Sequence, residues 1–268
     1  GSGVAVSSVI FQTVTNNRIL TPSVLGLDSL YNLFQTLIVF SLGSLNVALM
    51  GSNLNFLIAG GLMIVFSLFL FKMMFRRENT NLFFLLMIGM IFGTLFSSLS
   101  SFMQMVIDPN EYLVLQNKLF ASFNNVNVDI LFLSIILVLL MIPFVWDDIK
   151  YYDVMSLGKD QAINLGVDYD KIMKKSFVII AILIAISTSL VGPLTFLGIL
   201  VANITREMMK TYKHSYLITV SILVSIFTLV FGQVLMERIL HLSTPVSVVI
   251  NMIGGIYFMY LLYKESRI

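Results

Sequence analysis

The stretch ILFLSIILVLLMIPFVW, residues Ile130–Trp146, decides the fold class of this 268-residue chain. It contains no charged residue and is apolar at nearly every position, so a helix built from it has no polar face. A helix that is hydrophobic all round is buried in a large core or in a membrane, and about 20 such residues cross the hydrocarbon layer of a bilayer. The stretch therefore predicts a membrane-spanning helix.

Other uncharged runs extend this prediction over the whole chain. The clearest are Ser29–Met50, Leu54–Phe71, Leu82–Ile107, Tyr216–Met236 and Val246–Tyr263. The apolar range 177–204 is too long for one crossing, and we divide it at Gly192-Pro193 because proline lacks a helix donor and disfavours helix in the preceding residue. With the short apolar stretch 1–14, the count is about nine crossings. Continuously apolar runs exclude the alternating pattern of a β-barrel, so we expect an all-α polytopic transmembrane bundle forming one domain over residues 1–268.

The composition agrees with a transmembrane bundle and argues against an ordinary soluble protein. Hydrophobic residues make up 58% of the chain and charged residues 11%, against about 25% charged residues in soluble domains. The net charge of +2 gives no reason to expect nucleic acid as a partner. If the connections alternate sides, all Lys and Arg residues except Lys118 and Arg238 gather on one side, which predicts a cytoplasmic C-terminus.

The most charged connection, residues 147–176, lies on that cytoplasmic side. Ser156 is placed to cap a helix that runs through Asn164, Gly166 to end it in the left-handed conformation, and Asp168 to start the next helix. Two interpretations stay open from the residues alone. The segment is either a solvated linker or a docking platform, with Leu157, Ala162 and Leu165 as its apolar patch.

Two further features carry structural expectations. Gly89, Gly93, Ser97 and Ser101 recur every four positions, which predicts close approach of another helix. The longest outer connection, residues 108–129, predicts an amphipathic helix over Tyr112–Phe123.

The residues give no sign of catalytic or cofactor chemistry. No ionisable group lies at the centre of a predicted span, no Walker pattern is present, and neither the two histidines nor the scattered methionines form a metal-ligand pattern. No catalytic constellation of hydroxyl, histidine and acid can be assembled from the sequence, so we expect neither a catalytic residue nor a metal or cofactor.

Three segments resemble one family. LGKDQAINLGV (157–167), GPLTFLGILVANITR (192–206) and QTVTNNRILTPSVLG (12–26) are similar, in order and spacing, to signatures of the bacterial FecCD-like permeases, which import ferric siderophores, haem and cobalamin. The matching positions of the last two are Gln12, Asn17, Pro22, Leu25, Gly26, Gly192, Pro193, Phe196, Gly198 and Arg206. Four positions in these segments depart from the family pattern: Arg18 and Ala202 stand where proline is usual, Thr195 where glycine is usual and Asn203 where histidine is usual.

The resemblance implies a ten-span fold of which this chain lacks the first span. It implies a multi-pass protein of the bacterial cell membrane, which moves an iron chelate by alternating access and leaves ATP hydrolysis to separate cytoplasmic subunits. The expected partners are those ATPases, a second permease subunit, an extracytoplasmic binding protein and membrane lipid. Gly158, Ala162, Leu165 and Gly166, in segment 147–176, are the positions it assigns to ATPase coupling, and Arg238 to docking of the binding protein. The alternatives are an ion-coupled secondary transporter and a scaffolding membrane protein.

Overall fold

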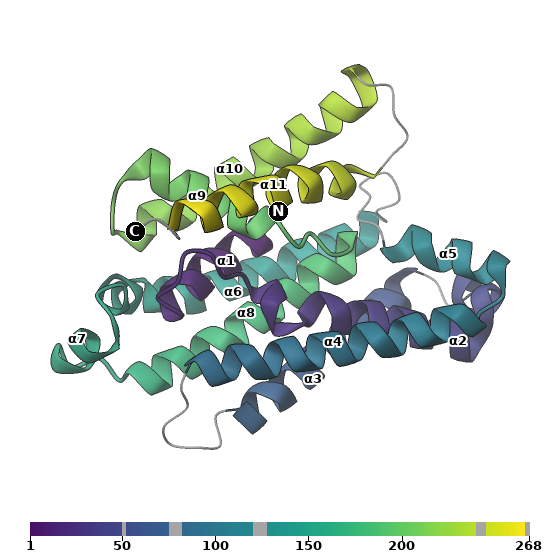
Figure 1. Cartoon of the computed structure of the whole chain (residues 1–268), viewed down its shortest axis with the longest axis horizontal. Coiled ribbons are helices and arrows are strands. Elements are labelled where there is room, and N and C mark those ends of the chain that lie inside the picture. Colours follow the sequence, from purple (N-terminus) through teal and green to yellow (C-terminus); the bar gives the residue numbers. More distant parts are fainter. Residues whose placement is uncertain (50–51, 75–81, 120–127, 240–244, 266–268) are drawn as a thin grey trace. The chain divides into compact units, whose positions relative to one another are not determined.

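The computed structural model describes residues 1–49, 52–74, 82–119, 128–239 and 245–265, and all regular elements in these ranges are helical (Figure 1). The chain divides into two compact units, which we describe separately. Unit 1 comprises residues 1–22, 138–183 and 194–268, and unit 2 comprises residues 23–137 and 184–193. The elements are α1 (Ser2–Val14), η1 (Pro22–Leu25), α2 (Leu27–Leu49), α3 (Ser52–Met74), α4 (Leu82–Val106), α5 (Pro109–Leu119), α6 (Val128–Met155), α7 (Lys159–Asn164), α8 (Tyr169–Val191), α9 (Leu197–Met209), α10 (His214–Val234), η2 (Leu235–Ile239) and α11 (Val246–Glu265).

Six of the described helices are long and apolar enough to cross a bilayer: Asn53–Lys72, Leu86–Val106, Val128–Met155, Tyr169–Val191, His214–Arg238 and Val246–Lys264. The other predicted crossings are shorter or interrupted. Helices α1 and α9 have 13 residues each, and α2 is broken at Gly43, whose backbone is not helical (φ 74°, ψ 156°). Length and apolarity therefore support six spans directly and leave the count of about nine as a prediction.

The predicted division at Gly192-Pro193 is confirmed. Helix α8 ends at Val191, Gly192 has a positive φ of 103°, and α9 begins at Leu197. Glycine adopts this φ without strain, and the following proline lacks the N–H that would continue a helix.

Unit 1 is built around α1. Most of its side chains are buried, and it packs against α9 and α10. The ring of Phe11 meets that of Phe177 edge to face at 5.8 Å. Gly198 of α9 permits this packing, because a Cβ there would lie 2.1 Å from Oγ of Ser8. Short apolar helices are thus stabilised here by tertiary contacts rather than by their length.

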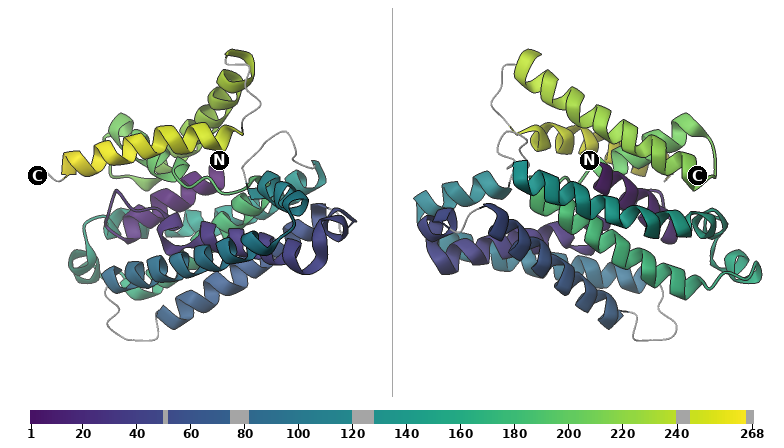
Figure 2. Two further views of the ribbon diagram at one scale, coloured as in Figure 1. Left: turned by 45° about the vertical axis from the view of Figure 1, so that its right-hand side comes forward. Right: turned by 180° about the vertical axis from the view of Figure 1, so that it is seen from behind.

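Unit 2 confirms the prediction from the small residues of α4. Gly93 lies so close to Gly26 that a Cβ on Gly26 would be 2.7 Å from the Gly93 Cα, and Gly26 has a positive φ of 77°. The hydroxyl of Ser97 donates to that of Ser29 at 3.0 Å. Of the four predicted positions, Gly89 and Gly93 are buried, and Ser97 and Ser101 are exposed. Helices α2 and α4 consequently lie side by side (Figure 2).

Two connections differ from prediction. Most of residues 147–176 is helical, since α6 continues to Met155 and α8 begins at Tyr169, so the connection itself is short. The charged ends of both helices stay helical because Val145, Tyr152 and Met155 of α6 and Phe177 of α8 are buried beside them. The outer connection does contain a helix, but α5 starts at Pro109 and ends at Leu119, and residues 120–127 lie outside the described ranges.

Candidate functional site

The connection between α6 and α8 carries the short helix α7, which lies beyond the ends of both long helices (Figure 2). It starts at Gly158, whose backbone (φ 102°, ψ 165°) is one that essentially only glycine adopts. It ends in a Schellman motif: the Gly166 N–H donates to the Ile163 carbonyl at 2.9 Å and the Val167 N–H to the Ala162 carbonyl at 3.0 Å. Gly166 has a φ of 82°, as the sequence predicted for a left-handed terminator.

Of the two predicted helix caps, the one at Asp168, at the start of α8, is confirmed, and the one at Ser156, before α7, is wrong. Oδ1 of Asp168 accepts a hydrogen bond from the Lys171 N–H at 3.1 Å, which caps the start of α8. Ser156 does not cap α7, because its hydroxyl donates to the Asp153 carbonyl at 2.7 Å and so closes the end of α6 instead. Helix α7 begins two residues later than predicted because Gly158, with its special backbone, is where the chain turns.

The apolar surface patch of α7 consists of different residues from those predicted. Ala162 is fully buried, whereas Leu157, Ile163 and Leu165 are 58%, 49% and 63% exposed. Ala162 therefore holds α7 against the chain, and the surface that it presents outward consists of the three larger side chains. The sequence prediction does not include Ile163, although its position next to Ala162 in a helix places it on a different face.

The ends of α6 and α8 that support α7 are joined by polar contacts. Nζ of Lys175 lies 2.9 Å from Oδ1 of Asp148, whose side chain is only 3% exposed. The Ser176 hydroxyl donates to the phenol oxygen of Tyr152 at 3.2 Å, and both side chains are fully buried. A buried carboxylate is costly unless it is paired, so Lys175 fixes the relative register of the two helices here.

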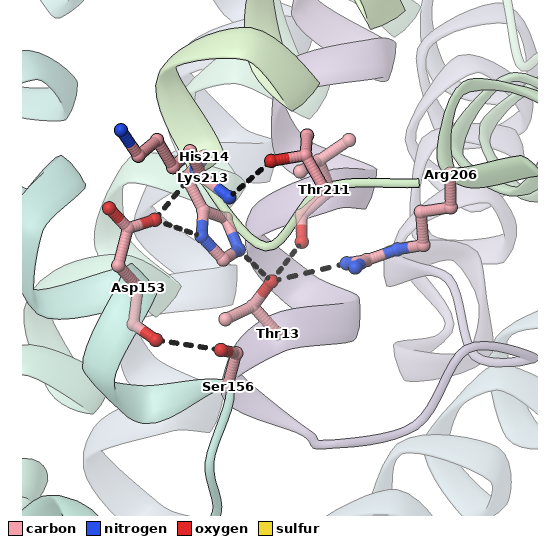
Figure 3. Close-up of polar contacts among 8 residues, drawn as sticks. Thr13, Asp153, Ser156, Arg206, Thr211, Lys213 and His214 are labelled. Carbon is pink, nitrogen blue, oxygen red and sulfur yellow. Dashed lines mark hydrogen bonds and ion pairs between the residues drawn. The ribbon is translucent and has the colours of Figure 1, made fainter. Parts of the chain in front are cut away.

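A second polar cluster links the last turn of α6 to α1 and α10 (Figure 3). Oδ1 of Asp153 lies 2.6 Å from the backbone nitrogen of His214 and 2.8 Å from its ring Nδ1. A carboxylate only accepts hydrogen bonds, so both nitrogens donate to it. Nε2 of His214 lies 2.7 Å from the Thr13 hydroxyl, which also receives a hydrogen bond from Nη2 of Arg206 at 3.3 Å. The imidazole is fully buried and all of its polar atoms are occupied.

Hydroxyl, imidazole and carboxylate thus stand in the order of a hydrolase triad, a grouping that could not be assembled from the sequence. Thr13 and His214 are 201 positions apart, and only the packing of α1 against α10 brings them together. Thr13 is 4% exposed and its hydroxyl also donates to the Val9 carbonyl at 2.9 Å, so it is closed to a substrate. The cluster therefore has a structural role and joins α6, α10 and α1.

The signature segments 12–26 and 192–206 meet in unit 1. Nε of Arg206 donates to the Gln12 side chain at 3.4 Å, and the amides of Gln12 and Asn203 both donate to the Arg18 carbonyl, at 2.7 and 3.0 Å. Two of the departures from the family pattern, Arg18 and Asn203, are therefore bonded to each other.

The other signature residues hold turns and close contacts. Oδ1 of Asn17 accepts from the Ile19 N–H at 2.9 Å, and Pro22 begins η1. Phe196 precedes α9 and packs on Gly254, where a Cβ would lie 2.5 Å from the Phe196 Cβ. Arg238 is exposed on η2, next to residues 240–244, which the structure does not describe. Among the described residues, no group of His, Asp and Glu side chains could hold a metal ion.

Six apolar helices long enough to cross a bilayer, a stiff charged connection and the packed signature segments are the features of a multi-pass membrane protein. The chain matches the FecCD transport family over residues 1–264 and belongs to it. It is thus a permease of the ABC importer class.

Named relatives and a solved structure agree with this assignment. The chain is 58% identical over 267 residues to the petrobactin import system permease protein YclO of Bacillus subtilis, covering 100% of this chain and 85% of the relative. It is 34% identical to the petrobactin import system permease protein FatC of Bacillus anthracis, covering 98% of this chain and 75% of the relative. A solved structure described as a metal-chelate type ABC transporter in an inward-facing conformation has the same fold, with a TM-score of 0.81 at 24% identity over 98% of this chain and 83% of that one.

Proposed function

We propose that this chain is the membrane-spanning subunit of an ATP-driven importer that carries a ferric siderophore into a bacterial cell by alternating access. The observation that carries the proposal is the 58% identity, along the whole chain, to a permease named for petrobactin import. Petrobactin or a closely similar iron chelate is the substrate we expect. The iron chelate is cargo, and the chain supplies a path for it rather than chemistry.

We assign the ATPase contact to α7 and its flanking turns, with Gly158, Ala162, Leu165 and Gly166 as the coupling positions. Two glycine-dependent turns and a Schellman motif make this element stiff, and exposed Leu165 gives it an apolar contact surface. A stiff element transmits displacement as rigid-body motion, whereas a solvated linker would absorb it. These features favour the docking platform over the linker.

The Asp153–His214 contact is the route by which we expect such a displacement to reach the spans. Asp153 lies three residues before Ser156, at the end of α6 next to α7, and His214 is the first residue of α10. Movement of the α6 end is thereby passed to α10 and, through Thr13, to α1. The link consists of hydrogen bonds with defined geometry, so it can carry force in a fixed direction.

The remaining assignments concern topology and assembly. We propose about nine crossings, with α1, α2 and α9 added to the six longer helices, because a protein environment allows short and broken helices inside a bilayer. Residues 1–268 then form one permease domain with a cytoplasmic C-terminus. A second permease subunit completes the path, and Arg238, on the opposite side from α7, contacts the extracytoplasmic binding protein.

Uptake by a defined system tests this function. Proteoliposomes containing the permease, its ATPase and its binding protein should accumulate iron-labelled petrobactin only when ATP is present on the ATPase side. Accumulation by the permease alone, driven by a proton or sodium gradient, would instead establish a secondary transporter. Loss of the gene without any change in chelate uptake would point to a scaffold.

A further inference from the structure

A cavity of about 940 Å³ opens in unit 1 where the chain after α1 meets the ends of α9 and α11. Its lining is strongly basic. Four cationic side chains face one carboxylate, that of Glu207, and these cations are Arg18, Arg206, Lys210 and Lys264. Such a concentration of one sign of charge in a concave surface attracts anions.

Within the described ranges, the carboxylates do not balance these cations. Among the described residues, neither arginine nor Lys210 has a carboxylate oxygen within 4.0 Å, and Glu207 reaches Lys264 only at 3.8 Å, with both side chains more than half exposed. In the part of the chain that the structure describes, the half-buried guanidinium of Arg206 donates to neutral oxygens, at 3.3 and 3.4 Å, and it points toward Thr13 in Figure 3. The positive charge of Arg18 lies near enough to Arg206 to repel it.

The backbone holds these groups in place. Two side-chain amides bind the Arg18 carbonyl, so the start of that side chain is fixed at the cavity edge. Lys210 ends α9 in the left-handed conformation (φ 43°), which favours glycine or asparagine and is uncommon for lysine. The chain thus places a cation at a position where its backbone prefers another residue type.

The cavity is bordered by the ends of two candidate spans, and the ends of a span lie at the level of lipid headgroups. His214, in its lining, is the first residue of one candidate span, and Lys264 is the last residue of another. Apolar Leu157 and Leu261 complete the wall beside the charges. A site with cationic and apolar walls at this level matches a phosphate group attached to a glycerol backbone.

We propose that this cavity binds a phosphate-bearing anion, with the two arginines and Lys210 contacting the phosphate oxygens. Guanidinium groups bind phosphate oxygens in pairs and lysine adds a point charge. The phosphate comes either from an anionic phospholipid headgroup or from free phosphate, and the chemistry is the same. The recessed position of Arg206 favours a small anionic group over an acidic protein surface. The proposal does not depend on the transported substrate.

The test uses the complete permease with Arg18→Gln and Lys210→Asn combined. Glutamine keeps the backbone bonds of residue 18, and asparagine suits the left-handed conformation at residue 210. Lys174→Gln is the matched control, because Lys174 is an exposed lysine of the same unit outside the cavity. Thermal unfolding establishes that all proteins are equally folded. Native mass spectrometry then measures retention of phosphatidylglycerol against phosphatidylcholine, and calorimetry in phosphatidylcholine nanodiscs measures inorganic phosphate binding.

We expect the double variant to bind phosphatidylglycerol on the order of tenfold more weakly than the wild type and the control, from the usual contribution of a basic residue near an anionic surface. If phosphatidylglycerol is retained selectively and inorganic phosphate is not, the source is lipid. If inorganic phosphate binds and the lipids are not distinguished, the source is free phosphate. Equal retention of both lipids without phosphate binding would overturn the proposal. The proposal would also be overturned if the double variant bound the anions as strongly as the wild type but no longer retained the ATPase, because the cavity would then be a protein contact.

Discussion

Asp153 and His214 are joined twice through a single carboxylate oxygen, which accepts from the backbone N–H of His214 at 2.6 Å and from its ring at 2.8 Å. A carboxylate at the C-terminal end of α6 is unfavourable for that helix, but the same carboxylate is favourable at the N-terminus of α10. Asp153 thus caps a helix that begins 61 positions away. Asp153 is part of α6, but its side chain stabilises the N-terminus of α10.

Asp153→Asn should weaken this connection while leaving the shape of the site intact. Asparagine keeps one acceptor oxygen but loses the charge, so we expect a loss of about 1–3 kcal/mol in unfolding free energy. We further expect ATP hydrolysis by the assembled importer to continue with less chelate moved per ATP. Thermal unfolding and the ratio of uptake to hydrolysis measure the two effects. Asp170→Asn, at an exposed carboxylate early in α8, is the control. Unchanged coupling in Asp153→Asn would show that the contact is only structural.

The two turn glycines of α7 should differ in their tolerance of alanine. At Gly166 a Cβ meets nothing within 4 Å, so the cost is backbone strain alone, about 1–2 kcal/mol. At Gly158 the backbone is one that essentially only glycine adopts, and a Cβ would also lie 3.1 Å from Oε1 of Gln161. Gly158→Ala should therefore increase hydrogen exchange in residues 157–167 more than Gly166→Ala does. The reverse order would contradict the assigned turn geometry.

Ala162 and Leu165 should act on ATPase binding by different means. Ala162→Arg forces a long charged side chain into a buried position, so we expect increased hydrogen exchange in α7 together with loss of the ATPase. Leu165→Asp changes an exposed side chain, so α7 should keep its protection while the ATPase is lost. Co-purification and hydrogen exchange separate the two variants. Retained ATPase in Leu165→Asp would remove Leu165 from the contact surface.

Gly89→Ala should destabilise the packing of α4 against η1, the short helix before α2. A Cβ at residue 89 would lie 2.8 Å from the Leu25 Cα, and backbone atoms yield only if the helices move apart. We expect a loss of about 1–3 kcal/mol in unfolding free energy. Gly61→Ala is the matched control, because it is also a helical glycine but has nothing within 4 Å of its added Cβ. Equal stability of the two variants, measured by thermal unfolding in detergent, would contradict the close contact.

Much of the fold could be read from local pattern. The uncharged run 130–146 lies within α6, and Gly192-Pro193 separates α8 from α9 as proline and glycine dictate. The left-handed turn at Gly166 followed from glycine alone, because its φ depends on the residue and not on distant neighbours. The end of α6 could not be read in this way. It extends through charged residues because Asp148 pairs with Lys175 of another helix, a tertiary contact that no local rule supplies.

The polar cluster was beyond sequence reasoning for the same reason. Thr13 lies in an apolar helix and His214 at the start of a span, so each is an ordinary residue for its position. Their contact depends on the packing of α1 against α10, which is set by buried apolar surface and by glycines such as Gly198. The burial of Ala162 was likewise not evident, since alanine is common both on helix surfaces and in cores.

We propose above all that α7 is the cytoplasmic element to which the ATPase binds. The chain has no cysteine, so Leu165→Cys introduces a single thiol at an exposed position. A membrane-impermeant maleimide should label this thiol in inside-out vesicles and not in right-side-out vesicles, and the addition of the ATPase should block the labelling. Labelling in right-side-out vesicles, or full labelling of inside-out vesicles with the ATPase bound, would contradict the claim.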